Sequence, residues 1–338
     1  MSDPVLVEVM RGDHVESVHR GAIAVCDFDL RSVLGIGDVE QPVFPRSAVK
    51  AIQALPLLET GAADAFGFGD RELALACASH SGEPIHVEQA SAMLAAVGLA
   101  EPALECGSHW PSSHDATLDL AREGRKPNQL HNNCSGKHAG FLAVCRQCGL
   151  DHHGYVAAGH PLQDMVRSTM EEVVGVPHDA SNRAVDGCSI PTYAVPLASL
   201  AAGFARMGGG RGLGELRARS ARRLLEASMR HPFLVAGTGR ADTRMMEAAP
   251  GRIFVKTGAE GVYCGVVPER GLAFAVKCAD GASRGAEAVV AGLLERLLRA
   301  DRDLAPRLAE LARPTIRSRR GAAVGLLRPT PMVADLAL

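Results

Sequence analysis

Residues 253–281 read IFVKTGAEGVYCGVVPERGLAFAVKCADG and carry the strongest local signals in the chain. Apolar, β-branched runs over 253–256, 262–267 and 272–278, with a Pro-Glu-Arg-Gly turn before the last run, predict a strand followed by a hairpin. Lys256, Thr257 and Gly258 stand at the end of the first run. A chain of this composition would contain that triplet by chance roughly 0.01 times, so the triplet is a specific signal.

Lysine is scarce in this sequence. Of 36 basic residues, 31 are arginine and five are lysine, at positions 50, 126, 137, 256 and 277. An amine can lose its proton inside a site and act as a base, whereas a guanidinium effectively never does. Each remaining lysine is therefore a candidate for chemistry that arginine cannot perform.

A serine precedes one of these lysines by three residues in FPRSAVKAIQALPLLE, residues 44–59. The pattern predicts a helix over Ser47–Glu59, on which Ser47 and Lys50 share one face. A Ser-x-x-Lys pair arises by chance roughly 0.3 times in this composition. Taken alone, the pair also fits a serine at a helix start followed by a solvated lysine.

The two signals together form part of a trio. Ser-x-x-Lys on a helix and a later Lys-Thr-Gly on a strand mark penicillin-recognising serine acyltransferases, and the third mark is a serine on an intervening loop. The segment CASHSGEP, residues 77–84, supplies Ser79 and Ser81 in the required order. The alternative for Ser79 is an ordinary helix cap.

The trio has a physical rationale. A serine hydroxyl is a poor nucleophile until a neighbour takes its proton, and Lys50 is placed to do so for Ser47. Lys256 would discourage Lys50 from keeping its charge, because like charges disfavour ionisation, and it could also form a second hydroxyl–amine pair with Ser79. Backbone N–H groups at the helix start could stabilise an oxyanion. These four side chains are therefore candidates for catalysis.

The order of predicted elements indicates an α+β fold in one unit spanning residues 1–338. Strands within 1–36 and 252–278 are expected to form one antiparallel sheet, with a large helical region over 46–250 and a further helix over 284–298. The expected N-terminal strands are 5–11, 15–20, 22–28 and 31–35, and the expected helices are 47–59, 71–78, 87–97, 136–148, 162–174, 197–207, 213–229 and 243–248.

A second group of candidates lies in QLHNNCSGKHAGFLA, residues 129–143. Cys134, Lys137 and His138 fall within one turn of a predicted helix and share a face. Cys188 occurs in the comparable setting VDGCSIPTY. Two thiols and a lysine could hold a soft metal such as zinc with one position open to water. The spacing matches no standard zinc motif, so the alternative is that the cysteines fill the core and Lys137 binds a substrate carboxylate.

Composition limits the classes of function. A net charge of −2 and a pI near 6.7 imply no attraction to nucleic acid or membrane surfaces. Nine cysteines, an odd number in a long chain, favour a reducing compartment over a disulfide framework. The first residues lack the basic start and small-residue cleavage site of a signal peptide, so we expect a cytoplasmic protein.

The motifs together resemble the Rhizobium-type L-asparaginase II family, also called the thermolabile or class 3 asparaginases. The resemblance covers nearly the whole chain and rests on six segments. These are PVLVEVMRGDHVESVHRGAIAV, FPRSAVKAIQALPLLETGAAD, CASHSGEPIHV, LHNNCSGKHAGFLA, DGCSIPTYAVPL and KTGAEGVYCGVVPERGLAFAVKCADG. The family's fold is akin to serine β-lactamases and glutaminases, which agrees with the trio.

The resemblance implies roles for individual residues. It pairs Ser47 with Lys50 and Ser79 with Lys256 as catalytic groups. It implies one zinc per chain, held by Cys134, Lys137 and Cys188. Some members have a further cysteine in the segment matching GTGRADTRMM, where this chain has Asp242. Residues of the same motifs expected to bind substrate are Arg46, His80, His138, Asp186 and Gly258.

Three functions remain open from the sequence. The first is hydrolysis of the L-asparagine side-chain amide through a serine acyl-enzyme, by a homodimer acting on a small molecule. The second is another serine acyl transfer, such as glutaminase or β-lactam hydrolysis. The third is a non-catalytic zinc- or amino-acid-binding relative, against which the intact Ser and Lys residues argue.

Overall fold

The computed structural model describes residues 3–336, and the chain divides into two compact units. The sheet unit comprises Met1–Ala48, Val195–Ala205 and Met245–Leu338. The helical unit comprises Val49–Ala194 and Arg206–Arg244. The expected single unit of 338 residues is thus built from two parts, and the sheet unit draws on three separate segments of the chain.

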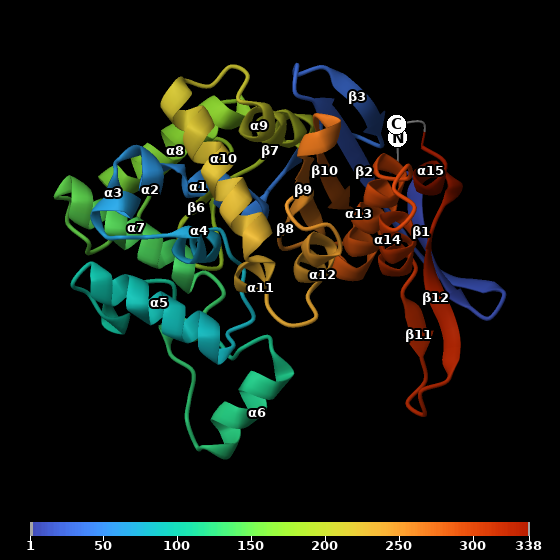
Figure 1. Cartoon of the computed structure of the whole chain (residues 1–338), viewed down its shortest axis with the longest axis horizontal. Coiled ribbons are helices and arrows are strands. Elements are labelled where there is room, and N and C mark those ends of the chain that lie inside the picture. The colour runs from blue at the N-terminus through green and yellow to red at the C-terminus, as the bar shows by residue number, and fades with distance from the viewer. Residues whose placement is uncertain (1–2, 337–338) are drawn as a thin grey trace. The chain divides into compact units, whose positions relative to one another are not determined.

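The sheet unit is built on one eight-stranded sheet in which every pairing is antiparallel. Strands from the two ends of the sequence lie side by side in it, blue against red in Figure 1. This confirms the α+β class and the sheet of N- and C-terminal strands. The order along the sheet is β11 (Thr315–Arg317), β12 (Ala323–Pro329), β1 (Val5–Arg11), β2 (His14–Asp27), β10 (Leu272–Cys278), β9 (Val262–Val267) and β8 (Phe254–Thr257), and β3 (Ser32–Ile36) also pairs with β2.

One prediction in this sheet was wrong. The runs 15–20 and 22–28 were expected to be two strands, whereas His14–Asp27 is one long strand. The glycine between them, Gly21, is not a turn. A Cβ atom at Gly21 would lie 2.0 Å from the carbonyl oxygen of Lys277 on β10, so the glycine marks a close backbone approach inside the sheet.

A long helix, α13 (Ser283–Leu297), covers this sheet and agrees with the helix expected over 284–298. It packs against β1, β9, β10 and β12 through apolar side chains such as Val289 and Leu293, which are fully buried. Each such side chain contributes about 1.5–3 kcal/mol by leaving water. The elements after this helix were not predicted, and they are α14 (Leu304–Ala312), β11, β12 and α15 (Pro331–Ala334).

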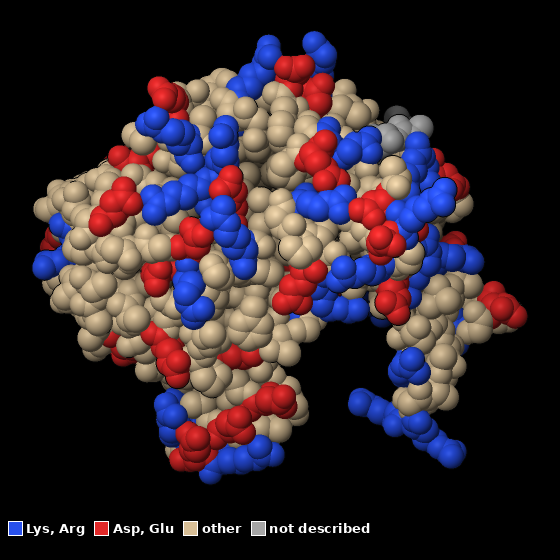
Figure 2. All heavy atoms as spheres, in the orientation of Figure 1, with Lys and Arg blue, Asp and Glu red and all other residues tan. Residues whose placement is uncertain are grey.

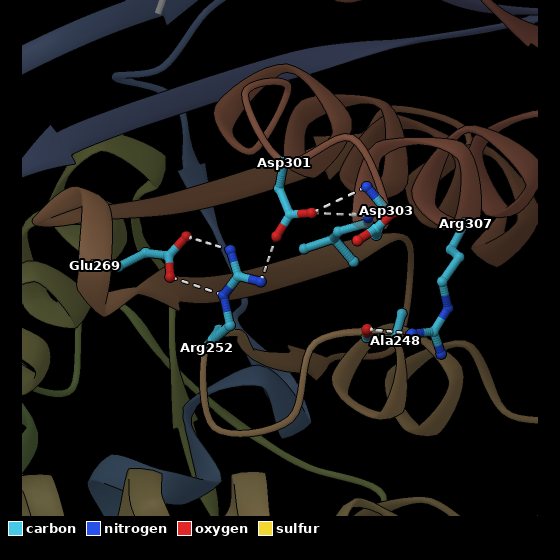
Figure 3. Close-up of polar contacts among 7 residues, drawn as sticks. Ala248, Arg252, Glu269, Asp301, Asp303 and Arg307 are labelled. Atoms are coloured by element: carbon cyan, nitrogen blue, oxygen red, sulfur yellow. Dashed lines mark hydrogen bonds and ion pairs between the residues drawn. The ribbon is translucent and has the colours of Figure 1, made fainter.

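An ionic network ties three loops of the sheet unit together (Figure 3). Arg252 donates to both carboxylate oxygens of Glu269, each at 2.8 Å, and to Asp301 at 2.7 Å. Asp301 in turn accepts the backbone N–H groups of Asp303 and Leu304. The two carboxylates raise the pKa of Arg252, because both stabilise its charged form.

The helical unit is made mostly of helices, with one short β5–β6 hairpin (Arg183–Val185 and Pro191–Tyr193). The helices expected over 71–78, 87–97, 136–148, 162–174 and 213–229 are all found within a few residues of those bounds. The helices of this unit are α1 (Lys50–Gln53), α2 (Leu55–Glu59), α3 (Ala62–Ala65), α4 (Asp70–Ala76), α5 (Pro84–Ala96), α6 (His114–Arg122), α7 (Ser135–Cys148), α8 (Pro161–Val174), α10 (Glu215–Arg230) and α11 (Pro232–Val235). The unit boundaries fall within η1 (Arg46–Val49), α9 (Leu197–Gly209) and α12 (Ala241–Ala248).

The continuous helix expected over 47–59 was wrong. The segment is instead a 3₁₀ turn, η1, followed by the short helices α1 and α2. Pro56 explains the break at Ala54, because proline has no N–H to donate and its ring clashes with the preceding turn. The interruption leaves Lys50 at the first position of a short, fully buried helix.

Candidate active site

Lys50 is the centre of the polar cluster in the helical unit. Its side chain is fully buried, and its Nζ atom lies 3.0 Å from Ser79 Oγ. Nζ also donates to two backbone carbonyl oxygens, those of Ala78 at 2.5 Å and Asn133 at 3.2 Å. The structure therefore gives Ser79 a hydroxyl–amine contact with Lys50, which the sequence had not indicated.

These three contacts restrict how the lysine can exchange a proton. The carbonyl oxygens only accept, so in both protonation states they hold two of the N–H bonds of Lys50. The hydroxyl of Ser79 is the neighbour among the three that both donates and accepts. When Lys50 is neutral in this arrangement, its lone pair is directed towards Ser79, so these two side chains can exchange a proton along that contact.

The loop that carries Ser79 is fixed by backbone contacts. Its N–H donates to the carbonyl of Val235, and the hydroxyl of Ser81 donates to the carbonyl of Ala236 at 2.7 Å. Of the two serines that the sequence offered for this position, Ser81 is thus committed to holding the loop, whereas Ser79 faces the lysine.

His80, expected to bind substrate, uses both ring nitrogens within the protein. Nδ1 accepts from the N–H of Gly82 at 3.2 Å, so Nε2 carries the proton and donates to Ser135 Oγ at 2.9 Å. Burial lowers the pKa of His80 well below its usual value, and the nearby His86 and Lys50 lower it further. This neutral, doubly bonded ring positions the loop between Ser79 and Gly82.

The predicted metal ligands also converge in the helical unit. Cys134 precedes α7, Lys137 lies in its first turn, and Cys188 comes from the turn between β5 and β6. Lys137 Nζ lies 3.0 Å from Cys188 Sγ, and all three side chains are buried. Gly136 makes this possible, because a Cβ atom there would lie 2.4 Å from the carbonyl oxygen of Leu75 on α4.

The charges of this cluster are strongly coupled. A hydrogen bond from Cys188 lowers the pKa of Cys134, burial opposes that shift, and the amines of Lys50 and Lys137 reinforce it. The same bond, together with burial, raises the pKa of Cys188. Burial alone would lower the pKa of Lys137, but the two sulfurs and Asp186 reverse the direction. Within this cluster the pKa of Cys134 is therefore lowered, whereas the pKa values of Cys188 and Lys137 are raised.

His138 presents an unsatisfied ring nitrogen next to this cluster. Its Nδ1 atom lies 2.6 Å from the hydroxyl of Tyr155, which also accepts the N–H of Glu105. The other ring nitrogen, Nε2, is buried and has no hydrogen-bond partner among residues 3–336. Burial lowers the pKa of His138 well below its usual value, and the charges of Lys137 and Lys50 lower it further. A buried polar atom without a partner costs about 1–3 kcal/mol, which a bound ligand that pairs with it would recover.

The sheet unit holds the other predicted catalytic residues. Ser47 is half-buried in η1, directly after Arg46, which has the unusual φ of 51°. Lys256 is fully buried on β8 and donates to the carbonyl of Thr257 at 2.7 Å. A Cβ atom at Gly258 would lie 2.5 Å from the carbonyl oxygen of Pro45, so this glycine lets the strand end approach the turn that carries Ser47.

Arg46 also lines a cavity of about 290 Å³ in the sheet unit. Four charged residues line it: the basic residues Arg46 and Lys277 and the acidic residues Asp3 and Glu260. Lys277 donates to the carbonyl oxygen of Glu260, and burial lowers its pKa. The cavity therefore combines charged groups of both signs with apolar side chains such as Val43 and Phe44.

A sequence model described as L-asparaginase II matches residues 7–329. The chain belongs to the L-asparaginase II family. Membership indicates an amidohydrolase acting on a small molecule, and the serine–lysine geometry of the helical unit agrees with that class. No curated protein matches the sequence.

Several solved structures resemble this chain, but both the sequence identities and the TM-scores of the superpositions are low. A β-lactamase, Mb2281c from Mycobacterium bovis, is 15% identical with a TM-score of 0.42, covering 86% of this chain and 95% of that one. The protein Mglu in its native form is 16% identical with a TM-score of 0.44, covering 84% of this chain and 65% of that one. Simvastatin synthase LovD from Aspergillus terreus, in an engineered form, is 11% identical with a TM-score of 0.38, covering 77% and 86%.

The surface of this asparaginase-family chain carries both signs of charge. Lysine and arginine side chains alternate with aspartate and glutamate across the face in Figure 2, as the net charge of −2 leads one to expect. Within residues 3–336, none of the helices has the length and apolar character needed to cross a bilayer.

Two contacts of the candidate site could not be predicted from the sequence. The carbonyl of Asn133 contacts Lys50, and Tyr155 orients His138, yet neither residue stands in a recognisable pattern. Only the unusual density of polar residues in HNNCSGKH could have drawn attention to Asn133. Asp242, at the position where some relatives have cysteine, is buried near the start of α12.

Proposed function

We propose that this protein hydrolyses the side-chain amide of L-asparagine to L-aspartate and ammonia. The observation that carries the proposal is the buried contact between Lys50 Nζ and Ser79 Oγ in a chain of the L-asparaginase II family. A buried amine beside a serine hydroxyl costs desolvation energy, which a purely structural role would not require.

In the proposed reaction Ser47, three residues before Lys50 along the chain, supplies the nucleophile. Its oxygen adds to the amide carbon while its proton passes to the amine of Lys50, and the Ser79 hydroxyl exchanges protons with that amine. The C–N bond then breaks, and the leaving ammonia takes up the proton. Water attacks the resulting ester by the same route in reverse, which releases aspartate and restores the serine.

Substrate recognition is assigned to charged and polar groups of the same motifs. Arg46 offers a guanidinium for the substrate carboxylate, and Asp186 offers a carboxylate for the amino group. The buried Nε2 atom of His138, which has no partner among residues 3–336, offers a hydrogen-bonding group. Gly258 contributes space, since any side chain there would meet the turn before Ser47.

Zinc is part of the proposal because the donor set fits it. Two sulfurs and one amine converge in the helical unit, the pKa of the Cys134 thiol is lowered, and such soft and nitrogen donors suit Zn²⁺. Cys134, Lys137 and Cys188 would hold one ion per chain, and Lys137 must lose its proton to serve as a ligand. A bound zinc would supply a Lewis acid for orienting the α-amino or α-carboxylate group of the substrate.

The test is ammonia release from purified protein with L-asparagine and L-glutamine, followed by peptide mass mapping of acid-quenched turnover. Ser47→Ala should lower kcat by about 10³-fold or more and abolish an acyl adduct on the peptide containing residue 47. Ser79→Ala should also be impaired, and the double variant should be no worse than the more damaged single one, because the residues act as a unit. Ser91→Ala, on the exposed face of α5, is the matched control.

A folded protein that releases no ammonia from asparagine would overturn the substrate assignment. An adduct on Ser79 would move the nucleophile to that residue, and full additivity between the two alanine variants would leave Ser79 with a separate binding role. A cytoplasmic homodimer belongs to the same proposal, and light scattering of the purified protein measures the second part of it directly.

A further inference from the structure

A second group of metal-ligating side chains lies in the sheet unit and takes no part in the proposed reaction. His19 is on β2, Cys278 is the last residue of β10, and Asp280 follows in the next turn. One donor atom from each lies within 4.8 Å of the others. His19 and Cys278 are 3% and 1% exposed, whereas the Asp280 side chain is 45% exposed, which leaves a route from solvent.

The carboxylate of Asp280 bridges the other two groups. Its Oδ2 atom lies 2.6 Å from His19 Nδ1, and its Oδ1 atom lies 3.2 Å from Cys278 Sγ. Gly285 in the first turn of α13 allows this closeness. A Cβ atom there would lie 2.7 Å from His19 Cγ and 2.8 Å from Cys278 Sγ, so both donors are packed against the same point of the helix backbone.

These donors match the requirements of a borderline-soft divalent ion. Imidazole nitrogen, thiolate sulfur and carboxylate oxygen are the three ligand types that Zn²⁺ takes from proteins. One thiolate and one carboxylate would balance the two positive charges, so a largely buried site would carry no net charge. We propose that His19, Cys278 and Asp280 form a binding site for a zinc-like divalent metal, with a further position open to water.

Arg284 forms a hydrogen bond with His19 that would have to break when this metal binds. Its Nε–H donates to His19 Nε2 at 3.0 Å, so Nε2 is an acceptor and the imidazole proton is on Nδ1, facing Asp280. A metal at Nδ1 would shift that proton to Nε2, where it would meet the donor of Arg284. Arg284 must then rotate away, and its exposed position at the start of α13 permits this.

The thiol must also release its proton, which passes to solvent when the metal–sulfur bond forms. Burial raises the pKa of Cys278 to about 12, and the hydrogen bond to Asp280 contributes to the increase. A filled site would tie β2, β10 and the turn before α13 together.

The experiment is a titration of metal-free protein with Co²⁺, which reports a sulfur ligand by thiolate-to-cobalt charge-transfer absorption. A Cys134→Ser, Cys188→Ser variant removes the other proposed thiolate site. We expect that variant to bind one cobalt per chain with a charge-transfer band, and to lose the band when His19→Gln or Cys278→Ser is added. Removing the competing donor by Arg284→Ala should tighten binding by about tenfold, since one charge-assisted hydrogen bond is worth about 1.5 kcal/mol or more.

Cys148→Ser, which removes an exposed thiol on α7, should leave the band unchanged. The solvent-facing group Asp151, His152 and His153 has no thiol and would bind cobalt without the band. If the triple variants fold poorly, the parent chain and Cys278→Ser are compared directly, and the parent should bind one more cobalt per chain. A missing band in the folded double variant both with and without Arg284→Ala would overturn the site, as would a band that survives Cys278→Ser.

Discussion

Cys134 and Cys278 are buried to nearly the same degree, with 4% and 1% of their surface exposed, yet their pKa values move in opposite directions. Cys134 accepts a hydrogen bond from Cys188 and lies near the amines of Lys50 and Lys137. Cys278 faces the carboxylate of Asp280. Burial alone raises a thiol pKa in both places, so the neighbouring groups decide the direction. The hydrogen bond from Cys188, followed by the amines, lowers the pKa of Cys134, whereas Asp280 adds to the increase at Cys278.

The contrast extends to the two units. The helical unit gathers lysines around sulfur and hydroxyl groups, which favours nucleophiles and anionic intermediates. The sheet unit places the carboxylate of Asp280 beside Cys278, which favours a neutral thiol or a bound cation. In the helical unit, substitutions can distinguish the charge of a lysine from its capacity to accept a proton. In the sheet unit, they can distinguish the effect of close packing from that of an ion pair.

The largest effect is expected for Lys50→Arg. The positive charge near Cys134 and Ser79 is kept, but the group that accepts a proton is lost, so kcat should fall by about 10³-fold or more. Steady-state ammonia release measures the change, and Lys126→Arg at an exposed position is the control. If the Lys50→Arg protein kept most of its activity, Lys50 would act through charge alone.

Gly258→Ala should have the next largest effect. The added Cβ would lie 2.5 Å from the carbonyl oxygen of Pro45, so the turn before Ser47 must shift, and displacements of about 1 Å can cost 10²-fold in rate. Gly35→Ala on β3 is the matched control in the same unit, because its added Cβ meets only Val39 at ordinary contact distance. Equal kcat values for the two variants would contradict a positioning role for Gly258.

Removing metal from the Cys134 cluster should have an intermediate effect on KM and little effect on Tm. Chelation of the protein as purified should raise KM for asparagine by about tenfold while leaving Tm within about 2 °C, because the Cys134 cluster is an open rather than a closed structural site. Lowering the pH should release the ion, since its ligands must be deprotonated to bind. Elemental analysis of protein prepared without chelator gives the stoichiometry, and a metal-free protein with an unchanged KM for asparagine would remove zinc from the mechanism.

The smallest effect is expected for Arg252→Gln in the network of Figure 3. The pair with Glu269 is doubly hydrogen-bonded but about a third exposed, so its loss should lower the free energy of unfolding by about 1 kcal/mol or less. Arg252 lowers the pKa of Glu269, so this stabilisation is present above the ordinary carboxylate range and is lost as pH falls through the folded pKa. Urea denaturation of both proteins at neutral and acidic pH should therefore show a difference that shrinks in acid.

Local sequence patterns predicted most of the strands and helices of the fold. The hairpin at 262–278 and the strand at 5–11 follow from periodicity and turn residues, and they agree with β9, β10 and β1. The predicted strand break at Gly21 and the predicted continuous helix over 47–59 were wrong. At Gly21 the deciding contact is with the carbonyl of Lys277, which lies on another strand. In residues 47–59 the helix is interrupted because Pro56 has no backbone N–H.

The site was predictable only as a set of residue types. The scarcity of lysine singled out Lys50, Lys137 and Lys256, all of which are buried. Their partners were harder to assign, because hydrogen bonding depends on the path of loops. Ser79 contacts Lys50 through a loop fixed by Val235, more than 150 positions away, and no spacing rule relates those residues.

The pairing of β1 with β12 has a consequence for how the protein is made. Val7 lies opposite Pro329, and β2 pairs with β10, so the N-terminal hairpin emerges from the ribosome long before its neighbours exist. At translation rates of 5–20 residues per second the wait for β12 is on the order of 15 to 60 s. During that time both edges of the hairpin are open to any other extended chain, while residues 49–194 of the helical unit are already complete enough to collapse. The sheet is thus the last part to close, and chaperone capture of nascent chains should peak before residue 260 leaves the exit tunnel and decline once β9, β10 and β12 have followed.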